Sequence, residues 1–85
     1  MSVRILYFAR LREEMGITQE MVDLPMETCD LKSLRAQLAA RGGASALALA
    51  PGKAVRASVN QDIAREDTPV KAGDEIAFFP PVTGG

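Results

Sequence analysis

The sequence predicts an α+β fold, in which a mixed sheet of four to five strands packs against one main helix. Runs rich in β-branched and aromatic residues occur near both ends of the chain and again in its second half. One stretch in the first half instead carries leucines at helical spacing. The chain has 85 residues, which is enough for one domain but not for two.

The N-terminal segment predicts two strands joined by a short helical turn. Residues 3–9 place apolar side chains on both faces of a strand, which is typical of a strand inside a sheet. Residues 10–15 form the turn, and Gly16 ends it because glycine tolerates the left-handed conformation. Residues 20–24 form the second strand, closed by Pro25.

The main helix is predicted to begin after Thr28 or Asp30, since either side chain can cap its N-terminus. Three leucines at spacings of three and four lie on one face, and polar residues take the other. Gly42-Gly43 is expected to end the helix, with a cation favourably placed near its negative end. The leucines are Leu31, Leu34 and Leu38, and the polar residues are Lys32, Arg35, Gln37 and Arg41.

The second half of the chain predicts three further strands. Residues 45–50 form a loose helical turn, and residues 55–59 alternate as a half-buried strand. A turn at 60–62 leads to a very short strand at 63–64, and residues 75–79 form the last strand. If the first and last strands are neighbours they run parallel, which the long connection permits. This order of elements is that of the β-grasp, or ubiquitin-like, fold.

Charge and composition exclude several classes of partner. The net charge is −1 with both signs mixed, so no basic stripe for nucleic acid and no polybasic membrane patch exists. No run approaches the ~20 apolar residues of a transmembrane helix. A single cysteine, Cys29, precludes an intramolecular disulfide and fits a reducing compartment. We therefore expect a cytoplasmic protein.

Few residues offer chemistry of their own. The chain has no histidine, which removes the commonest general base and metal ligand, and no metal site is expected. Gly52-Lys53 lacks the spacing and hydroxyl residue of a phosphate loop and is interpreted as part of a turn. Three adjacent acidic pairs, at 13–14, 66–67 and 74–75, are interpreted as surface charge. Cys29, at a helix start, is interpreted as a half-buried structural residue rather than a reactive thiolate.

The C-terminal segment is the exception. Pro80 and Pro81 stop the last strand and stiffen its exit, and small residues follow to Gly85. Four residues span roughly 13–14 Å when extended, and glycine fits a narrow channel. We expect residues 1–81 to form the domain and 82–85 a flexible tail. The two glycines alone would favour an ordinary frayed terminus, but the prolines and paired phenylalanines before them, on a predicted β-grasp domain, favour a functional tail.

The sequence resembles the small, sulfur-carrying subunit of molybdopterin synthase, the MoaD family of ubiquitin-like carriers. The resemblance extends over essentially the whole chain. Its specific parts are residues 5–13 (Ile-Leu-Tyr-Phe-Ala-Arg-Leu-Arg-Glu), residues 59–61 (Val-Asn-Gln) and residues 73–85, which end in Phe-Phe-Pro-Pro-Val-Thr-Gly-Gly. Members often have serine where this chain has Thr83, a departure that keeps a small hydroxyl residue.

The resemblance implies a route for sulfur. An E1-like adenylating enzyme would use ATP to attach AMP to the carboxylate of Gly85, and a sulfur donor protein would convert it to a thiocarboxylate. The tail would then enter the large catalytic subunit and pass sulfur to cyclic pyranopterin monophosphate, in two rounds, to form the dithiolene of molybdopterin. The family assembly is a heterotetramer. No cofactor is bound permanently, and the chain alone is not expected to be catalytic.

The residues expected to bind the partner are Phe79, Pro80, Pro81, Val82, Thr83 and Gly84. Phe79 is predicted to face outward because Phe78 shares its face with Ile76. Two alternatives remain open: a carrier for thiamine or tRNA thiolation or a lysine-conjugated modifier, and a pure interaction module without tail chemistry.

Overall fold

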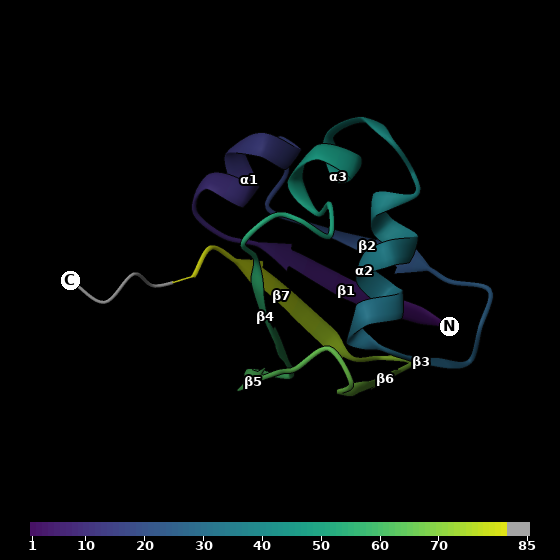
Figure 1. Cartoon of the computed structure of the whole chain (residues 1–85). Helices are drawn as coiled ribbons and strands as arrows, with labels where there is room; N and C mark the ends of the chain where they lie inside the picture. The colour runs from purple at the N-terminus through teal and green to yellow at the C-terminus, as the bar shows by residue number, and fades with distance from the viewer. Residues whose placement is uncertain (82–85) are drawn as a thin grey trace.

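The computed structural model describes residues 1–81, and a five-stranded sheet with the order β2-β1-β7-β4-β5 organises them (Figure 1). The first and last strands are parallel neighbours, and the other pairs in the sheet are antiparallel. The predicted mixed sheet of the β-grasp fold is confirmed. Its strands are β1 (Ser2–Tyr7), β2 (Gln19–Asp23), β4 (Arg56–Val59), β5 (Asp62–Ile63) and β7 (Glu75–Phe79).

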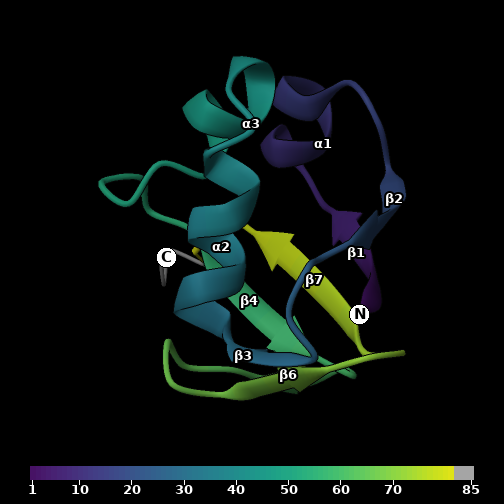
Figure 2. The same ribbon diagram turned by 90° about the vertical axis from the view of Figure 1, so that its right-hand side faces the viewer.

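Three helices lie on one face of this sheet and leave the other open (Figures 1 and 2). They are α1 (Arg10–Met15), α2 (Leu31–Ala39) and α3 (Gly43–Ala48). Asp30 caps α2, because its Oδ1 accepts a hydrogen bond from the backbone N–H of Ser33 at 2.7 Å. Gly16 ends α1 in the left-handed conformation at φ 75°, as the sequence predicted.

The core lies between α2 and the inner face of the sheet. Val3, Ile5 and Tyr7 alternate inward along β1 and are at most 1% exposed. The three leucines of α2 are buried against them in the same cluster, which confirms the predicted helix face. Each such side chain stabilises the fold by roughly 1.5–3 kcal/mol through its removal from water.

One prediction about the helices was wrong, and one pair of strands was missed. The main helix ends at Ala39 and not at Gly42-Gly43, because Gly42, with φ 79°, instead precedes α3. A small second sheet, β3 (Thr28–Asp30) paired with β6 (Pro69–Lys71), was not predicted. Strands of three residues are too short to show an alternating pattern, and these two are far apart in sequence.

A polar network joins the sheet to the end of α2. The hydroxyl of Tyr7 donates to Glu20 at 2.7 Å, and Arg41 donates to both oxygens of Glu20 at 2.8 and 3.0 Å. Arg41 also donates to Ser45 of α3 at 2.8 Å. Burial, then the contact with Glu20, raises the pKa of Tyr7, whereas the Arg41 hydrogen bonds lower the pKa of Glu20. Arg41 is exposed, as predicted for the polar side of the helix, but it lies two residues beyond the end of α2 and is bonded across to β2.

A second network fixes the start of β7. Asp74 is 4% exposed and accepts hydrogen bonds from Asn60 Nδ2 at 3.0 Å and from the Lys71 backbone N–H at 2.9 Å. Asn60 in turn accepts from the backbone N–H of Glu75 at 3.0 Å. Asn60 and Gln61 have φ values of 51° and 73°, which make the tight turn between β4 and β5. The position of β7 is thereby tied to the β4–β5 hairpin.

Candidate functional site

The central strand β7 leads the chain out of the sheet between the end of β1 and the start of β4. Phe78 pairs with Tyr7 of β1, and Phe79 pairs with Arg56 of β4. Pro80 and Pro81 follow and are half-buried. Because proline has no N–H to donate, the ladder stops there. The chain therefore leaves the sheet from its middle, with a strand on either side.

Phe78 and Phe79 lie on opposite faces, as the sequence predicted. Phe78 is 1% exposed and stacks on Tyr7 with ring centroids 6.3 Å apart. Phe79 is half-exposed on the face that the helices do not cover. Its place beside the exit of the chain suits a hydrophobic contact with a partner.

The open face carries other apolar side chains besides the predicted Phe79. Register places Leu6 beside Ala77, Ala77 beside Ser58 and Ser58 beside Ile63, in one row across the sheet. Phe8, whose backbone N–H donates to the carbonyl of Phe78 at 3.1 Å, continues β1 beside Phe79. We call the apolar members of this set the open-face patch: Leu6, Phe8, Ile63, Ala77 and Phe79. Phe8 and Ile63 are 47% and 66% exposed and are available to a partner, whereas Leu6 and Phe79 are half-buried and Ala77 is 8% exposed.

Leu6 and Phe8 had a signal in the sequence, because residues 3–9 placed apolar side chains on both faces of the strand. That pattern was interpreted only as evidence for an interior strand. Ile63 had no comparable signal, since β5 has two residues and its face depends on the hairpin register.

The tail itself lies outside the part of the chain that the structure describes. The predicted roles of Val82, Thr83, Gly84 and Gly85 therefore stay predictions. Of the six residues expected to bind the partner, the structure places Phe79, Pro80 and Pro81 together at the end of β7.

The structure also describes the surroundings of Cys29 and of the acidic pair at 74–75. Cys29 lies in β3, half-buried, and burial together with the charge of Asp30 raises the pKa of its thiol, so the thiolate is disfavoured. Asp74 is fully engaged by the network at the start of β7 and is not surface charge, contrary to the interpretation of pair 74–75. Within residues 1–81, no three acidic or cysteine side chains gather as a metal site would require.

The structure thus defines a ubiquitin-like β-grasp protein whose central strand delivers the C-terminal segment next to an apolar open face. Residues 5–85 match the model of the ThiS family, and the chain belongs to that family. Within the described residues, none of the helices is long and apolar enough to cross a membrane.

Individual relatives share most of their length with this chain. It is 44% identical over 85 residues to the molybdopterin synthase sulfur carrier subunit of Escherichia coli (strain K12), covering 98% of this chain and 99% of that one. SAMP1 from Haloferax volcanii is 26% identical, with a TM-score of 0.76 and full coverage of both chains. A chain of the complex of subunits 1 and 2 of molybdopterin-converting factor from Helicobacter pylori 26695 is 29% identical, with a TM-score of 0.64 and full coverage of both.

Proposed function

We propose that this protein is the sulfur carrier of a molybdopterin synthase and that the C-terminal carboxylate of Gly85 carries the sulfur. The 44% identity to a carrier subunit of that synthase over nearly the whole chain is the observation that supports this most directly. The geometry agrees, because β7 ends in two prolines at a face rich in exposed apolar side chains.

Loading requires chemistry from partners. A C-terminal carboxylate has a reference pKa of about 3.3–3.7, so it is ionised at neutral pH and a poor electrophile. In the proposed route an E1-like enzyme transfers AMP from ATP to the Gly85 carboxylate, with loss of pyrophosphate. Sulfur at the oxidation level of sulfide, supplied by the donor, then attacks the carbonyl carbon; a C–S bond replaces the C–O bond to AMP, AMP leaves, and the product is the thiocarboxylate.

Delivery requires a second partner. In the proposed route the large catalytic subunit holds cyclic pyranopterin monophosphate, and the tail brings the thiocarboxylate to it. The thiocarboxylate sulfur forms a bond to a carbon of the pterin precursor, and water then cleaves the acyl C–S bond, which leaves the sulfur on the pterin and restores the Gly85 carboxylate for the next round. Holding the sulfur at a fixed position beside the acceptor replaces an encounter in solution, which is an entropic advantage.

The open-face patch is proposed as the surface that holds this large subunit. The relative from Helicobacter pylori was solved as a complex of subunits 1 and 2, which supports a two-subunit assembly. Phe79 would serve as the anchor, because it is half-exposed, rigid and directly joined to the exit of the tail. Leu6 and Ala77 lie beside it on the same face and would exclude water around it.

The intact mass of the protein tests the proposal. After incubation with a matching adenylating enzyme, ATP and a sulfur source, the mass should rise by the exchange of one oxygen for one sulfur. Addition of the large subunit and the pterin precursor should reverse that gain. A larger covalent product on lysines would indicate a modifier, and no change at all would indicate an interaction module; either result would exclude the carrier.

Two variants test the role of Gly85. Deletion of Gly85, or addition of one residue after it, should abolish sulfur loading because the carboxylate no longer lies at the required depth in the partner. Thermal unfolding should be unchanged in both variants. Loading that persists at the rate of the original chain would contradict the proposed position of the reacting group.

A further inference from the structure

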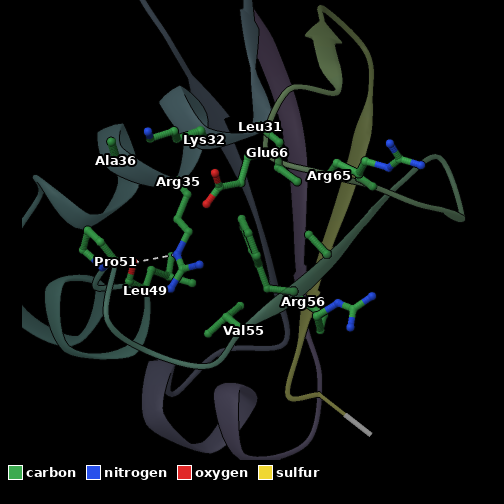
Figure 3. A pocket seen from close by; sticks show the side chains of 13 residues that line it. Leu31, Lys32, Arg35, Ala36, Leu49, Pro51, Val55, Arg56, Arg65 and Glu66 are labelled. Atoms are coloured by element: carbon green, nitrogen blue, oxygen red, sulfur yellow. Dashed lines mark hydrogen bonds between the residues drawn. The ribbon is translucent and has the colours of Figure 1, made fainter.

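A groove opens between α2 and the β4 side of the sheet, on the face opposite to the open-face patch (Figure 3). It has a volume of about 380 Å³. Ala36 of α2, Val55 and Pro51 of the segment before β4, and Ala64 after β5 line it, with Phe78 among the residues below. We call this the helix–sheet groove.

Small side chains keep the groove open. Ala36, Ala57 and Ala64 line it at positions where larger apolar residues would extend the core. Protein interiors are close-packed and contain few voids larger than a water molecule. The fold therefore does not require a space of this size beside the buried side chain of Phe78. The ring of Phe78 faces this groove, whereas the ring of Phe79 faces the open side of the sheet.

Arg35 builds one wall of the groove. Its guanidinium donates three hydrogen bonds to backbone carbonyls: to Leu49 at 2.9 Å, to Ala50 at 2.6 Å and to Lys53 at 2.9 Å. Figure 3 shows the side chain extending from α2 to this segment. These bonds tie residues 49–53 to α2, so this wall of the groove is fixed before a ligand binds.

The opening of the groove is basic, although the chain as a whole carries a net charge of −1. Lys32 and Arg65 line the groove with exposed side chains, and the acidic residue beside them is Glu66. Arg35 and Arg56 also line it, but the Arg35 guanidinium is bonded to three backbone carbonyls, and Arg56 pairs with Phe79 on the outer face of the sheet. Lys32 and Arg65 are exposed and extend outward on different sides of the opening in Figure 3. Such a rim attracts and orients an acidic ligand.

We propose that the helix–sheet groove binds an acidic segment of a partner protein, which inserts one apolar side chain between α2 and β4 while its carboxylates meet Lys32 and Arg65. The apolar lining of the groove favours an apolar side chain over a small inorganic anion as the ligand. The basic rim favours acidic residues on either side of that side chain. Since the groove opens on the helical side, this segment can bind while another protein covers the open-face patch.

A peptide titration tests the site. The probe is a synthetic hexapeptide, acetyl-EEFLED-amide, added to the ¹⁵N-labelled full chain and followed by amide chemical shifts. The largest shifts are expected at Ala36, Val55 and Ala64, with weaker binding at high salt because the charges are screened. A peptide with serine in place of both apolar residues should bind at least about ten times more weakly.

Two variants sharpen the test. The double variant Lys32→Glu/Arg65→Glu should weaken binding of the peptide by about tenfold or more, because it reverses two charges on the rim. The matched control, Arg4→Glu/Arg12→Glu, reverses two exposed charges outside the groove and should leave the affinity within about twofold. Thermal unfolding of both variants establishes that each is folded.

Ala36→Phe provides an independent test by filling the groove from the exposed side of α2. It should abolish the peptide shifts without lowering the unfolding temperature. The proposal is overturned if the shifts map to the open-face patch, if the serine peptide binds equally well, or if no groove shift occurs at millimolar peptide. It is also overturned if groove shifts depend on protein concentration without peptide, since a second copy would then be the occupant.

Discussion

Both faces of the central sheet carry apolar side chains, but those on one face form the core and those on the other lie at the surface. On the inner face, Ile5, Tyr7 and Phe78 are at most 1% exposed and meet the helices. On the outer face, which the helices leave uncovered, Phe8 and Ile63 are exposed and Phe79 is half-exposed. Adjacent residues on one strand, Phe78 and Phe79, thus belong to a core and to a surface.

Because of this difference, substitutions on the inner face should affect the stability of the fold, and substitutions on the outer face should affect binding. Inward side chains lose contact with water on folding, so their removal should unfold the protein. Outward side chains have still to be removed from water, so their removal should affect complexes and leave the isolated fold almost unchanged. Substitutions on the two faces should therefore give opposite patterns of effect.

Phe78→Ala should have the largest effect on stability. The variant loses the stacking on Tyr7 and leaves a cavity, at a cost of about 3–5 kcal/mol in the free energy of unfolding. This is a large part of the stability of a domain of this size. Urea unfolding followed by circular dichroism measures it, and a loss below about 1 kcal/mol would show that this face is not the core.

Phe79→Ala should reverse that pattern. The affinity for the large subunit should fall about 30-fold, corresponding to the loss of an interfacial anchor worth about 2 kcal/mol. The free energy of unfolding should change by no more than about 1 kcal/mol, because the side chain is already half-exposed. Calorimetry with the large subunit measures the affinity; equal affinities for both proteins would remove Phe79 from the interface.

Asp74→Asn should destabilise the protein by about 1–3 kcal/mol at neutral pH. Asp74 accepts hydrogen bonds from Asn60, from the Lys71 backbone and from the Lys71 ammonium, and an amide has only one acceptor oxygen for them. The exposed Asp67→Asn is the matched control and should be neutral.

The same residue predicts a dependence on pH. Burial alone would raise the pKa of the Asp74 carboxyl, but the hydrogen bonds from Asn60 and Lys71 outweigh burial and lower it. Its contribution is therefore complete above the pKa of the unfolded chain and is lost as the pH falls through the lowered folded pKa. Unfolding curves between neutral and acidic pH should show this loss in the original chain and a smaller one in Asp74→Asn.

Ala9→Gly should have the smallest effect, and a favourable one. Ala9 follows the exposed Phe8 with φ 53° and ψ −132°, a conformation that costs a residue with a Cβ about 1–3 kcal/mol. Glycine should raise the free energy of unfolding by about 1 kcal/mol. Ala40→Gly, at an ordinary helical φ of −66°, should lower it instead; a loss of stability in Ala9→Gly would contradict the strained conformation.

Local patterns predicted most of the elements, because their signals lie within a few residues. The bounds of β7 at Glu75–Phe79 and of α1 at Arg10–Met15 agree with the prediction, since prolines and a glycine mark their ends. The pairing of β3 with β6 was missed because it joins segments about 40 residues apart, at Cys29 and Val70, and neither strand alternates for long enough.

The parts of the site that lie within one strand were predictable from the sequence, and those that depend on neighbouring strands were not. Pro80, Pro81 and the outward position of Phe79 follow from residue type and the two-residue period of a strand. The addition of Phe8 and Ile63 to the same face depends on strand order and on the hairpin register, which one strand alone does not contain. The basic rim of the helix–sheet groove gathers residues from 32 to 65, so no local charge run indicated it.

The sequence by itself determined the α+β class, the bounds of the last strand and the absence of histidine, because periodicity, turn residues and composition can be read without knowing the tertiary contacts. The tertiary structure decided which face of that strand stays open, which hydrogen bonds Asp74 and Arg41 make, and that Lys32 and Arg65 line the same groove. Each of these depends on contacts between segments distant in the chain, whose energies are realised only when the sheet and α2 come together.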